Sequence, residues 1–330
     1  MRVVLISESW LSHRIIASTL ALSLNSDLII YNPLNPFKII NKLIGEKVIF
    51  FGGGNKSHIR VLLYYTPFTF DKMLYISSTA IFKYSLYHSM ADNAGVKFIH
   101  PSRFHGDFMR RMGYKKVYHI PHAYPMDIDL PDDIIIQSIE NRKYRKKFTL
   151  LSIFTSQGIY KGIEQYLKAL ELTKGNMRII IKILDDRFLF SLPMNKEIII
   201  YKGKVKSSRN DIINLILSSD LVVIPSLIEG FGMPIIESLR LGRPVLTLDA
   251  PPMNEINNKK VGYLVKIEKR KVIDRGEYID ILNYPNISDF AEKIEEAVND
   301  PNWEEKCFNA FQYAKNNFNP YVLYRKFLSI

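Results

Sequence analysis

Residues 221–243 read LVVIPSLIEGFGMPIIESLRLGR and contain a change from strand to helix. The apolar run Leu221–Ile224 predicts a buried strand, and Pro234 predicts the first turn of a helix, where its missing N–H costs nothing. Gly230 and Gly232 in the loop allow a ligand to approach the backbone closely, and the free N–H groups of a helix start favour an anion. The stretch therefore predicts a strand–loop–helix unit that binds an anionic ligand.

Two carboxylates flank this loop. Glu229 lies in the loop and Glu237 lies eight positions later, on the predicted helix. A carboxylate there can accept two hydroxyl hydrogen bonds, as the diol of a ribose would offer. The same spacing of two glutamates is common by chance, so the surrounding glycines and Pro234 decide the interpretation. Together they favour a ligand site over a solvated helix face.

Short apolar runs predict a series of buried strands in the first 120 residues. The runs are Val3–Ile6, Leu28–Tyr31, Val48–Phe51, Val61–Tyr65, Val96–Ile99 and Val117–Ile120. Helical patterns lie between several of them, at Ile15–Leu24 and Phe70–Tyr87. This alternation indicates a parallel sheet covered by helices.

The alternation pauses at Asp127–Lys147 and then restarts. This segment carries a basic run at residues 142–147, which we interpret as a solvated charged face in a connection between domains. Four of the next strands are predicted at Leu150–Phe154, Ile179–Leu184, Ile198–Tyr201 and Val245–Leu248. Helices are predicted at Gly162–Thr173, Asp211–Ser218 and Pro234–Leu241, and the segment Ile287–Ile330 is predicted to be helical.

The composition sets the class of protein. A chain of 330 residues suggests two domains or one large α/β unit. The net charge of +12 points to anionic partners. The single cysteine, Cys307, can form no internal disulfide, which favours a reducing compartment. No apolar run reaches the ~20 residues of a membrane span, so we expect a cytoplasmic protein with, at most, peripheral contact with a membrane.

The pattern Ser226-x-x-Glu229-Gly230-Phe231-Gly232-x-Pro234-x-x-Glu237, followed by Gly242-x-Pro244-Val245, resembles the E-x7-E signature of retaining glycosyltransferases of family four, which have the GT-B fold. Four further motifs resemble that family and follow in the family's order: Phe98–Phe104, Tyr118–His122, Lys161-Gly162, and Asn254–Ile256 with Gly262–Val265. Several motifs in register make the resemblance specific, whereas each alone would be weak.

The resemblance implies an α/β fold of two Rossmann-like parallel-sheet domains that face each other across a cleft. We expect an acceptor-side domain at residues 1–140 and a donor-binding domain at 141–305. A C-terminal helix at 306–330 would cross back to the first domain. The implied reaction is the metal-independent transfer of a sugar, with retention, from a nucleotide diphosphate sugar linked to UDP or GDP. No other cofactor is expected.

The resemblance also assigns residues to the donor site. Lys161 would bind the diphosphate and Glu229 the reacting sugar, and these two are the predicted catalytic residues. The predicted donor-binding residues are Glu237, Gly230, Phe231, Gly232, Met233 and Ser156. Ser156 stands where the family usually has an arginine, so a phosphate-neutralising charge is missing or comes from Arg209, Arg103 or the linker.

The acceptor side is less well specified by the sequence. The candidates there are Gly53, Gly54, His105 and His122. Each histidine alone is more typical of a structural position. The acceptor is expected to be a glycan, a lipid or a protein, and the aromatic stretch 64–87 with the basic residues of 103–116 suggests contact with an anionic membrane. Nucleic acid is not expected as a partner, and no histidine or aspartate spacing predicts a metal site.

Three other functions stay open. A sugar-nucleotide epimerase would use a similar two-domain frame, and hydrolysis or epimerisation without acceptor would favour it. A DNA-glucosylating transferase would explain the charge of +12, although the basic residues are spread over both halves of the chain. A non-catalytic module that binds a nucleotide sugar is supported only by the missing arginine.

Overall fold

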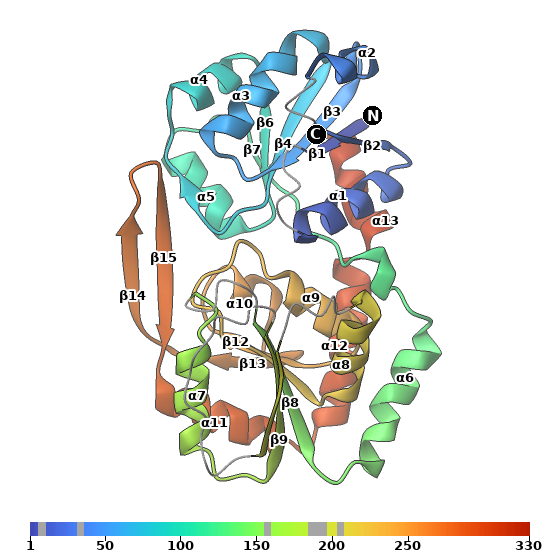
Figure 1. Cartoon of the computed structure of the whole chain (residues 1–330), viewed down its shortest axis with the longest axis vertical. Helices are drawn as coiled ribbons and strands as arrows, with labels where there is room; N and C mark the ends of the chain where they lie inside the picture. Colours follow the sequence, from blue (N-terminus) through green and yellow to red (C-terminus); the bar gives the residue numbers. More distant parts are fainter. Residues whose placement is uncertain (6–10, 32–35, 155–159, 184–196, 203–207) are drawn as a thin grey trace. The chain divides into compact units, whose positions relative to one another are not determined.

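The chain forms two compact α/β units in a computed structural model that describes residues 1–5, 11–31, 36–154, 160–183, 197–202 and 208–330 (Figure 1). Unit 1 comprises residues 1–126, 273–280 and 318–330, and unit 2 comprises residues 127–272 and 281–317. The chain thus passes from unit 1 to unit 2 at Met126–Asp127, ahead of the expected division at residue 140. The C-terminal residues that group with unit 1 begin at Phe318, after the last long helix.

Unit 1 is built on a six-stranded parallel sheet in the order β2-β1-β3-β4-β6-β7. The strands are β1 (Arg2–Leu5), β2 (Asp27–Ile30), β3 (Lys47–Gly52), β4 (Asp71–Ile76), β6 (Lys97–His100) and β7 (Val117–His119). The inner strands β1, β3, β4 and β6 are largely buried, which is why they read as continuous apolar runs, whereas the edge strands β2 and β7 are partly exposed.

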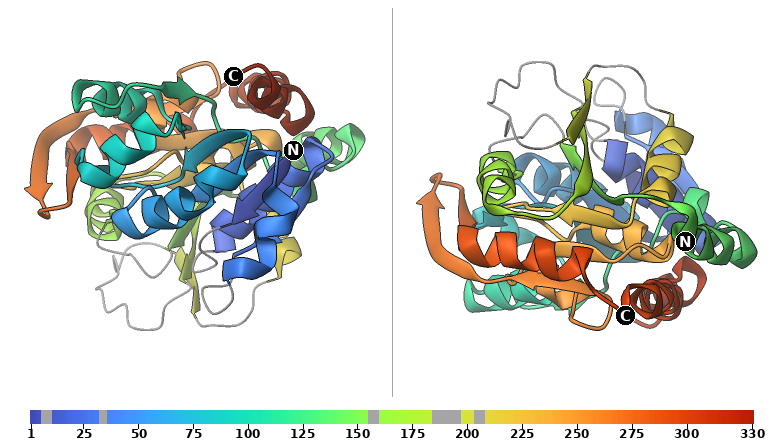
Figure 2. Two further views of the ribbon diagram at one scale, coloured as in Figure 1. Left: turned by 90° about the horizontal axis from the view of Figure 1, so that it is seen from above. Right: turned by 90° about the horizontal axis from the view of Figure 1, so that it is seen from below.

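Helices cover this sheet, as Figures 1 and 2 show. The helices are α1 (Leu11–Ser23), α2 (Ile40–Leu43), α3 (Lys56–Tyr65), α4 (Leu86–Asn93), α5 (Arg103–Arg111) and the C-terminal α13 (Pro320–Leu323). α1 packs against α13, and α3 packs against α4. Apolar residues of α2, α3, α4 and α5 form a core with the strands.

Two predicted elements of unit 1 are wrong. The run Val61–Tyr65 belongs to helix α3, not to a strand, and the predicted helix Phe70–Tyr87 contains the strands β4 and β5 (Ile81–Phe82). The Asn55 side chain accepts a hydrogen bond from the backbone N–H of His58 and so caps α3 ahead of the apolar run. Short apolar runs fit a helix and a strand equally well, and here the cap decides.

Unit 2 has a second six-stranded parallel sheet, in the order β10-β9-β8-β11-β12-β13. The strands are β8 (Phe148–Phe154), β9 (Met177–Ile183), β10 (Glu197–Lys202), β11 (Leu221–Ile224), β12 (Val245–Leu248) and β13 (Gly262–Val265). Two parallel sheets in sequence confirm the predicted α/β class.

The helices of unit 2 pack in two groups. They are α6 (Asp132–Glu140), α7 (Ile163–Leu172), α8 (Arg209–Ser218), α9 (Met233–Arg240), α10 (Met253–Ile256), α11 (Ile287–Val298) and α12 (Trp303–Asn317). α7 packs against α11, whereas α12 packs against α9 and α6. Over the described ranges of both units, no helix is long and apolar enough to span a bilayer.

A small three-stranded sheet, β14-β15-β5, was not predicted. β14 (Ile267–Asp274) and β15 (Tyr278–Pro285) form a hairpin, and β15 pairs antiparallel with β5 through Tyr278 and Ile279. β14 is largely exposed and rich in charged residues, so it lacks the apolar pattern that signals a strand.

The basic run of the linker also differs from its interpretation as a solvated face. Arg142 and Arg145 both contact Asp220, whose side chain is fully buried, at 3.1 and 2.9 Å. The second oxygen of Asp220 accepts a 2.7 Å hydrogen bond from the backbone N–H of Thr149. A buried carboxylate needs such partners, so part of this run is structural.

All histidines of the chain lie in unit 1, and burial lowers the pKa of each one. They are His13, His58, His88, His100, His105, His119 and His122. The pKa falls from 6.5 to about 4 for His58, His105 and His119. These side chains are therefore neutral in the folded unit at neutral pH.

Unit 1 should consequently lose stability as the pH falls from about 6.5 toward 4. The unfolded chain takes up protons below about 6.5, whereas the folded unit resists them until about 4. At pH 5 each such histidine should lower the free energy of unfolding by on the order of 1–2 kcal/mol. Hydrogen exchange, corrected for intrinsic rates, should show acid-dependent opening in peptides of residues 47–76 but not of 221–248. Equal acceleration in both units would contradict the histidine explanation.

Candidate donor site

The β11–α9 loop has the predicted strand–loop–helix form. β11 ends at Ile224, and α9 begins at Met233 with Pro234 in its first turn. Gly232 precedes the helix with φ of +113°, and a Cβ there would lie 2.7 Å from Cδ1 of Ile235. Only glycine suits this position, and no side chain caps the first N–H groups of α9. Pro234 has no N–H, and the N–H of Ile235 donates to the carbonyl oxygen of Gly232 at 2.9 Å. An anion at this helix start would therefore be held by the N–H of Met233 and those of the preceding loop.

A second loop, between β8 and α7, packs directly on the first. Gly162 has φ of +70°, and a Cβ at this position would lie 2.0 Å from the carbonyl oxygen of Pro225. Two residues earlier, the carbonyl of Tyr160 accepts a 2.8 Å hydrogen bond from the N–H of Leu227. The carbonyl of Leu227 in turn accepts a bond from the N–H of Asn283 in β15. The neighbour of Gly162, Lys161, is thereby fixed against the β11–α9 loop.

The two predicted catalytic residues meet at this contact. The Nζ of Lys161 donates a hydrogen bond to Oε1 of Glu229. The two side chains are only 19% and 9% exposed, so their charges are poorly screened by water. A lysine on this loop presents a compact charge that suits phosphate oxygens.

Glu237 has a cationic partner that the sequence had suggested only as a replacement for a missing arginine. Nη2 of Arg209, the first residue of α8, donates to Oε1 of Glu237 at 2.6 Å. Burial raises the pKa of Glu237, and the Arg209 charge opposes that rise. The same guanidinium bonds to Asp127 at 2.8 Å. The contact joins residues 28 positions apart, so no local sequence pattern predicts it.

The other predicted donor-binding residues are Gly230, Phe231, Gly232, Met233 and Ser156. Phe231 is buried and Met233 is half-buried, both at the loop next to Gly230 and Gly232. Ser156 lies outside the described residues. Over the described parts of the chain, no group of three or more His, Cys, Asp or Glu side chains is arranged to hold a metal ion.

Three of the acceptor-side candidates lie near the carboxyl ends of the strands of unit 1. Gly53, which follows β3 and precedes Gly54, donates its N–H to Nδ1 of His58 at 2.8 Å. Nε2 of His122 lies 3.1 Å from Oγ of Ser77, the residue after β4. Nε2 of His13 lies 3.0 Å from the carbonyl oxygen of the same serine. The sequence had not singled out His13 or Ser77, because neither belongs to a recognisable motif.

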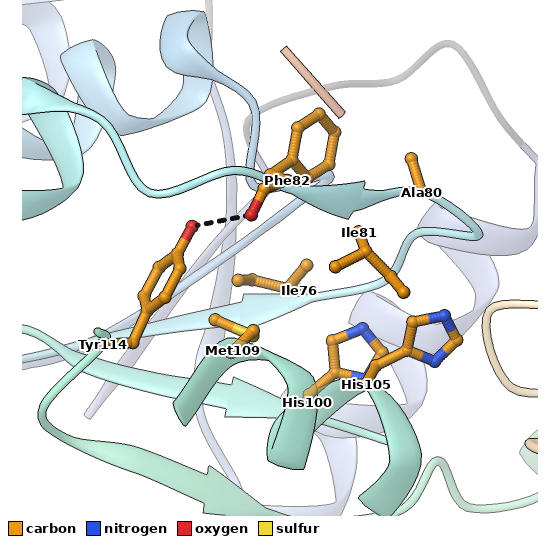
Figure 3. A pocket seen from close by; sticks show the side chains of 8 residues that line it. All are labelled: Ile76, Ala80, Ile81, Phe82, His100, His105, Met109 and Tyr114. Atoms are coloured by element: carbon orange, nitrogen blue, oxygen red, sulfur yellow. Dashed lines mark hydrogen bonds between the residues drawn. The ribbon is translucent and has the colours of Figure 1, made fainter. Parts of the chain in front are cut away.

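His105 lines a separate small cavity in unit 1 (Figure 3). Its ring stacks on that of His100, with the ring centres 4.7 Å apart. The cavity measures about 10 Å³, room for about one water molecule. Its lining is Ile76, Ala80, Ile81, Phe82, His100, His105, Met109 and Tyr114. A cavity of this size does not admit a sugar.

Comparison with known protein families identifies the donor-site half of the chain. The family described as "Glycosyl transferases group 1" matches residues 135–316, more than half of the sequence. The chain belongs to this family. The matched range includes both loops of the site, with Lys161, Glu229 and Glu237.

Individual relatives of this group 1 glycosyl transferase are distant. A 63-residue stretch is 36% identical to uncharacterized glycosyltransferase 335 of Sulfolobus islandicus rod-shaped virus 1, and it spans 19% of each protein. The structure of HepE from Anabaena in complex with UDP-glucose superposes with a TM-score of 0.69 and 14% identity, over 100% of this chain and 98% of that chain. A glycosyltransferase from Rickettsia africae gives a TM-score of 0.68 and 16% identity, over 99% and 97%. These matches confirm the GT-B fold.

The contact of Gly162 with Pro225 should be the most sensitive backbone position of the site. Gly162→Ala combines left-handed strain with a steric clash, and we expect it to lower the free energy of unfolding by about 2–5 kcal/mol. Gly45→Ala is the matched control, because Gly45 also has φ of +70° but no atom lies within 4 Å of the place that its Cβ would occupy.

The control should cost only the strain, about 1–2 kcal/mol. Denaturant unfolding would measure both costs. Hydrogen exchange of residues 221–233 should accelerate in Gly162→Ala and not in Gly45→Ala. Equal costs, with no change in exchange, would show that the two loops do not depend on this contact.

Proposed function

We propose that the protein is a retaining glycosyltransferase of family four that transfers a sugar from a UDP- or GDP-linked donor to an acceptor hydroxyl. The observation that carries this proposal is the contact of Lys161 with Glu229 beside the uncapped start of α9. A cation and free N–H groups suit a diphosphate, and a neighbouring carboxylate suits the sugar attached to it. HepE, of the same fold, binds UDP-glucose, which supports a uridine nucleotide.

The proposed reaction exchanges one bond at the anomeric carbon for another. The bond from this carbon to the phosphate oxygen breaks, and the acceptor oxygen bonds to the same face of the sugar. The acceptor proton passes to the departing phosphate oxygen. Negative charge therefore gathers on the diphosphate, where Lys161 and the N–H groups near Gly230–Gly232 would stabilise it.

The two glutamates would bind different parts of the donor. Glu229 would hold the hydroxyls of the reacting sugar or stabilise positive charge on its ring. Glu237, on α9, would accept hydrogen bonds from the ribose. Of the acceptor-side residues, His122 contacts the hydroxyl of Ser77, whose carbonyl oxygen is in turn contacted by His13. We propose a glycan, lipid or protein acceptor in the cytoplasm, with peripheral contact with an anionic membrane for a lipid acceptor.

Substitution of each glutamate tests this division. Glu237→Ala should raise the donor KM with little change in kcat, because a ribose clamp contributes equally to ground and transition states. Glu229→Ala should lower kcat, because its contact strengthens as charge develops on the sugar. Loss of a charged hydrogen-bond partner costs about 1.5–3 kcal/mol, so each effect should be roughly 10- to 150-fold.

Glu164→Ala is the matched control, since Glu164 is an exposed glutamate in the first turn of α7 near Lys161. It should leave both constants unchanged. Transfer would be followed by mass spectrometry of the product, with circular dichroism to check folding. The same kinetic pattern in both variants, or normal turnover in Glu229→Ala, would refute the division of roles.

Donor binding should not need a metal ion. The motivation is the pair of cations, Lys161 and Arg209, that already stand at the proposed diphosphate and ribose positions. UDP or GDP in the presence of EDTA should stabilise the protein by ~2.7 kcal/mol at 100 times the dissociation constant. Calorimetric binding that disappears in EDTA would refute metal-independent binding.

A further inference from the structure

Arg209 joins two carboxylates from separate parts of unit 2. Its Nη2 contacts Oε1 of Glu237 on α9 at 2.6 Å, and its Nε contacts Oδ2 of Asp127 at 2.8 Å. Nη2 also lies 3.4 Å from Oδ1 of Asp127, so the planar guanidinium faces that carboxylate with two nitrogens. Such two-point contact fixes the orientation of an arginine, which a lysine would not achieve.

The Glu237 carboxylate is held at one oxygen only. Glu237 as a whole is 9% exposed, so its charge is largely removed from water. Within the described residues, Oε1 is bonded to Arg209 and Oε2 has no hydrogen-bond partner. The side chain of Glu237 is 12% exposed and Oε2 is not fully buried, so water or a ligand can reach it. This oxygen is the natural acceptor for a hydroxyl group of a ligand.

We propose that Arg209 is a positioning residue of the donor site, which fixes the Glu237 carboxylate so that Oε2 accepts hydrogen bonds from the ribose of a nucleoside diphosphate. The inference rests on the proposed function, because it takes Glu237 as the ribose ligand. Asp127 holds the far side of Arg209. Through these contacts, Asp127 and Arg209 would set the position of Oε2 of Glu237. Arg209 itself would not touch the reacting sugar.

Two charged side chains act on Glu237, and they act in opposite directions. Arg209 favours the ionised carboxylate, whereas Asp127 disfavours it and thereby raises its pKa. Removal of the Arg209 charge should therefore let the pKa of Glu237 rise further. Removal of the Asp127 charge should let it fall. Because only the ionised carboxylate is a full acceptor for two hydroxyls, the acid limit of nucleotide binding should follow these changes.

The experiment measures the affinity for UDP by calorimetry from pH 5 to pH 8. At pH 7, Arg209→Gln should weaken UDP binding about tenfold, and the pH at which affinity is half-lost should rise by about one unit. Asp127→Asn should shift that pH downward. Arg178→Gln is the matched control, because Arg178 forms an exposed 3.5 Å ion pair with Glu197 in the same unit. It should change neither quantity.

Two further measurements separate positioning from general structural support. The penalty of Arg209→Gln should shrink when 2′-deoxyuridine diphosphate replaces UDP, since one of the ribose hydroxyls is then absent. Arg209→Lys keeps the charge but loses the two-point contact. It should weaken binding while leaving the acid limit near that of the wild type. It also serves as the folded alternative if Arg209→Gln does not fold.

The outcomes distinguish this inference from the proposed function. If Glu237→Gln weakens UDP binding but Arg209→Gln changes neither affinity nor its pH dependence, the role of Arg209 is refuted and the donor site stands. Shifts of the same sign in Arg209→Gln and Asp127→Asn would also refute it. If the wild-type protein binds neither UDP nor GDP, the proposed function itself fails.

Discussion

The donor site depends on the close packing of two backbone segments, Gly162 on the carbonyl of Pro225. No side chain can occupy that space, because a Cβ would lie 2.0 Å from the carbonyl oxygen. The contact holds the start of α7 against the residues that follow β11, and the hydrogen bond from the N–H of Leu227 to the carbonyl of Tyr160 supports it. Lys161 and Glu229 are 68 positions apart in the chain, and they meet because their immediate neighbours are fixed in this way. Rigid backbone here would place the two proposed catalytic side chains with little loss of side-chain freedom on ligand binding.

Burial and pairing distinguish Asp220 from the two carboxylates of unit 2 that we propose to bind the donor. Asp220 is fully buried and both its oxygens have partners, among them Arg145 and the N–H of Thr149. Such a group is satisfied and serves the fold. Glu229 and Glu237 are held by one cation each and keep side-chain exposures of 9% and 12%. A ligand can supply the missing hydrogen bonds of a carboxylate that is mostly buried but still open to solvent. Glu229 and Glu237 are both of this kind, and both lie near the start of α9.

The sequence predicted the parts of the fold whose signals are local. Pro234 and Gly232 mark the start of α9, and the buried runs of β1, β3 and β11 are long and uniform, so these elements lie where expected. Val61–Tyr65 was misassigned because five apolar residues suit either period, and only the cap at Asn55 distinguishes them. The β14–β15 hairpin was not predicted, because its exposed strand β14 is rich in charged residues and lacks an apolar pattern. Motif spacing brought Lys161, Glu229 and Glu237 forward as candidates. It could not reveal that Arg209 contacts Glu237, since that pairing exists only after α8 and α9 have packed.

The two units are expected to respond to acid in different ways, unit 1 through its folding and unit 2 through its binding of a ligand. Unit 1 keeps its histidines neutral by burial, so protonation opposes its folding as the pH falls. In unit 2 burial raises the pKa of Glu237, so a lower pH would remove the charge that we propose to bind ribose. Under the proposed function, activity would be lost in acid for two separate reasons, one in the stability of unit 1 and one in a single carboxylate of unit 2. Because the first involves all seven histidines and the second only Arg209, Glu237 and Asp127, we expect substitution at Arg209 to move the pH limit of binding without moving that of unfolding.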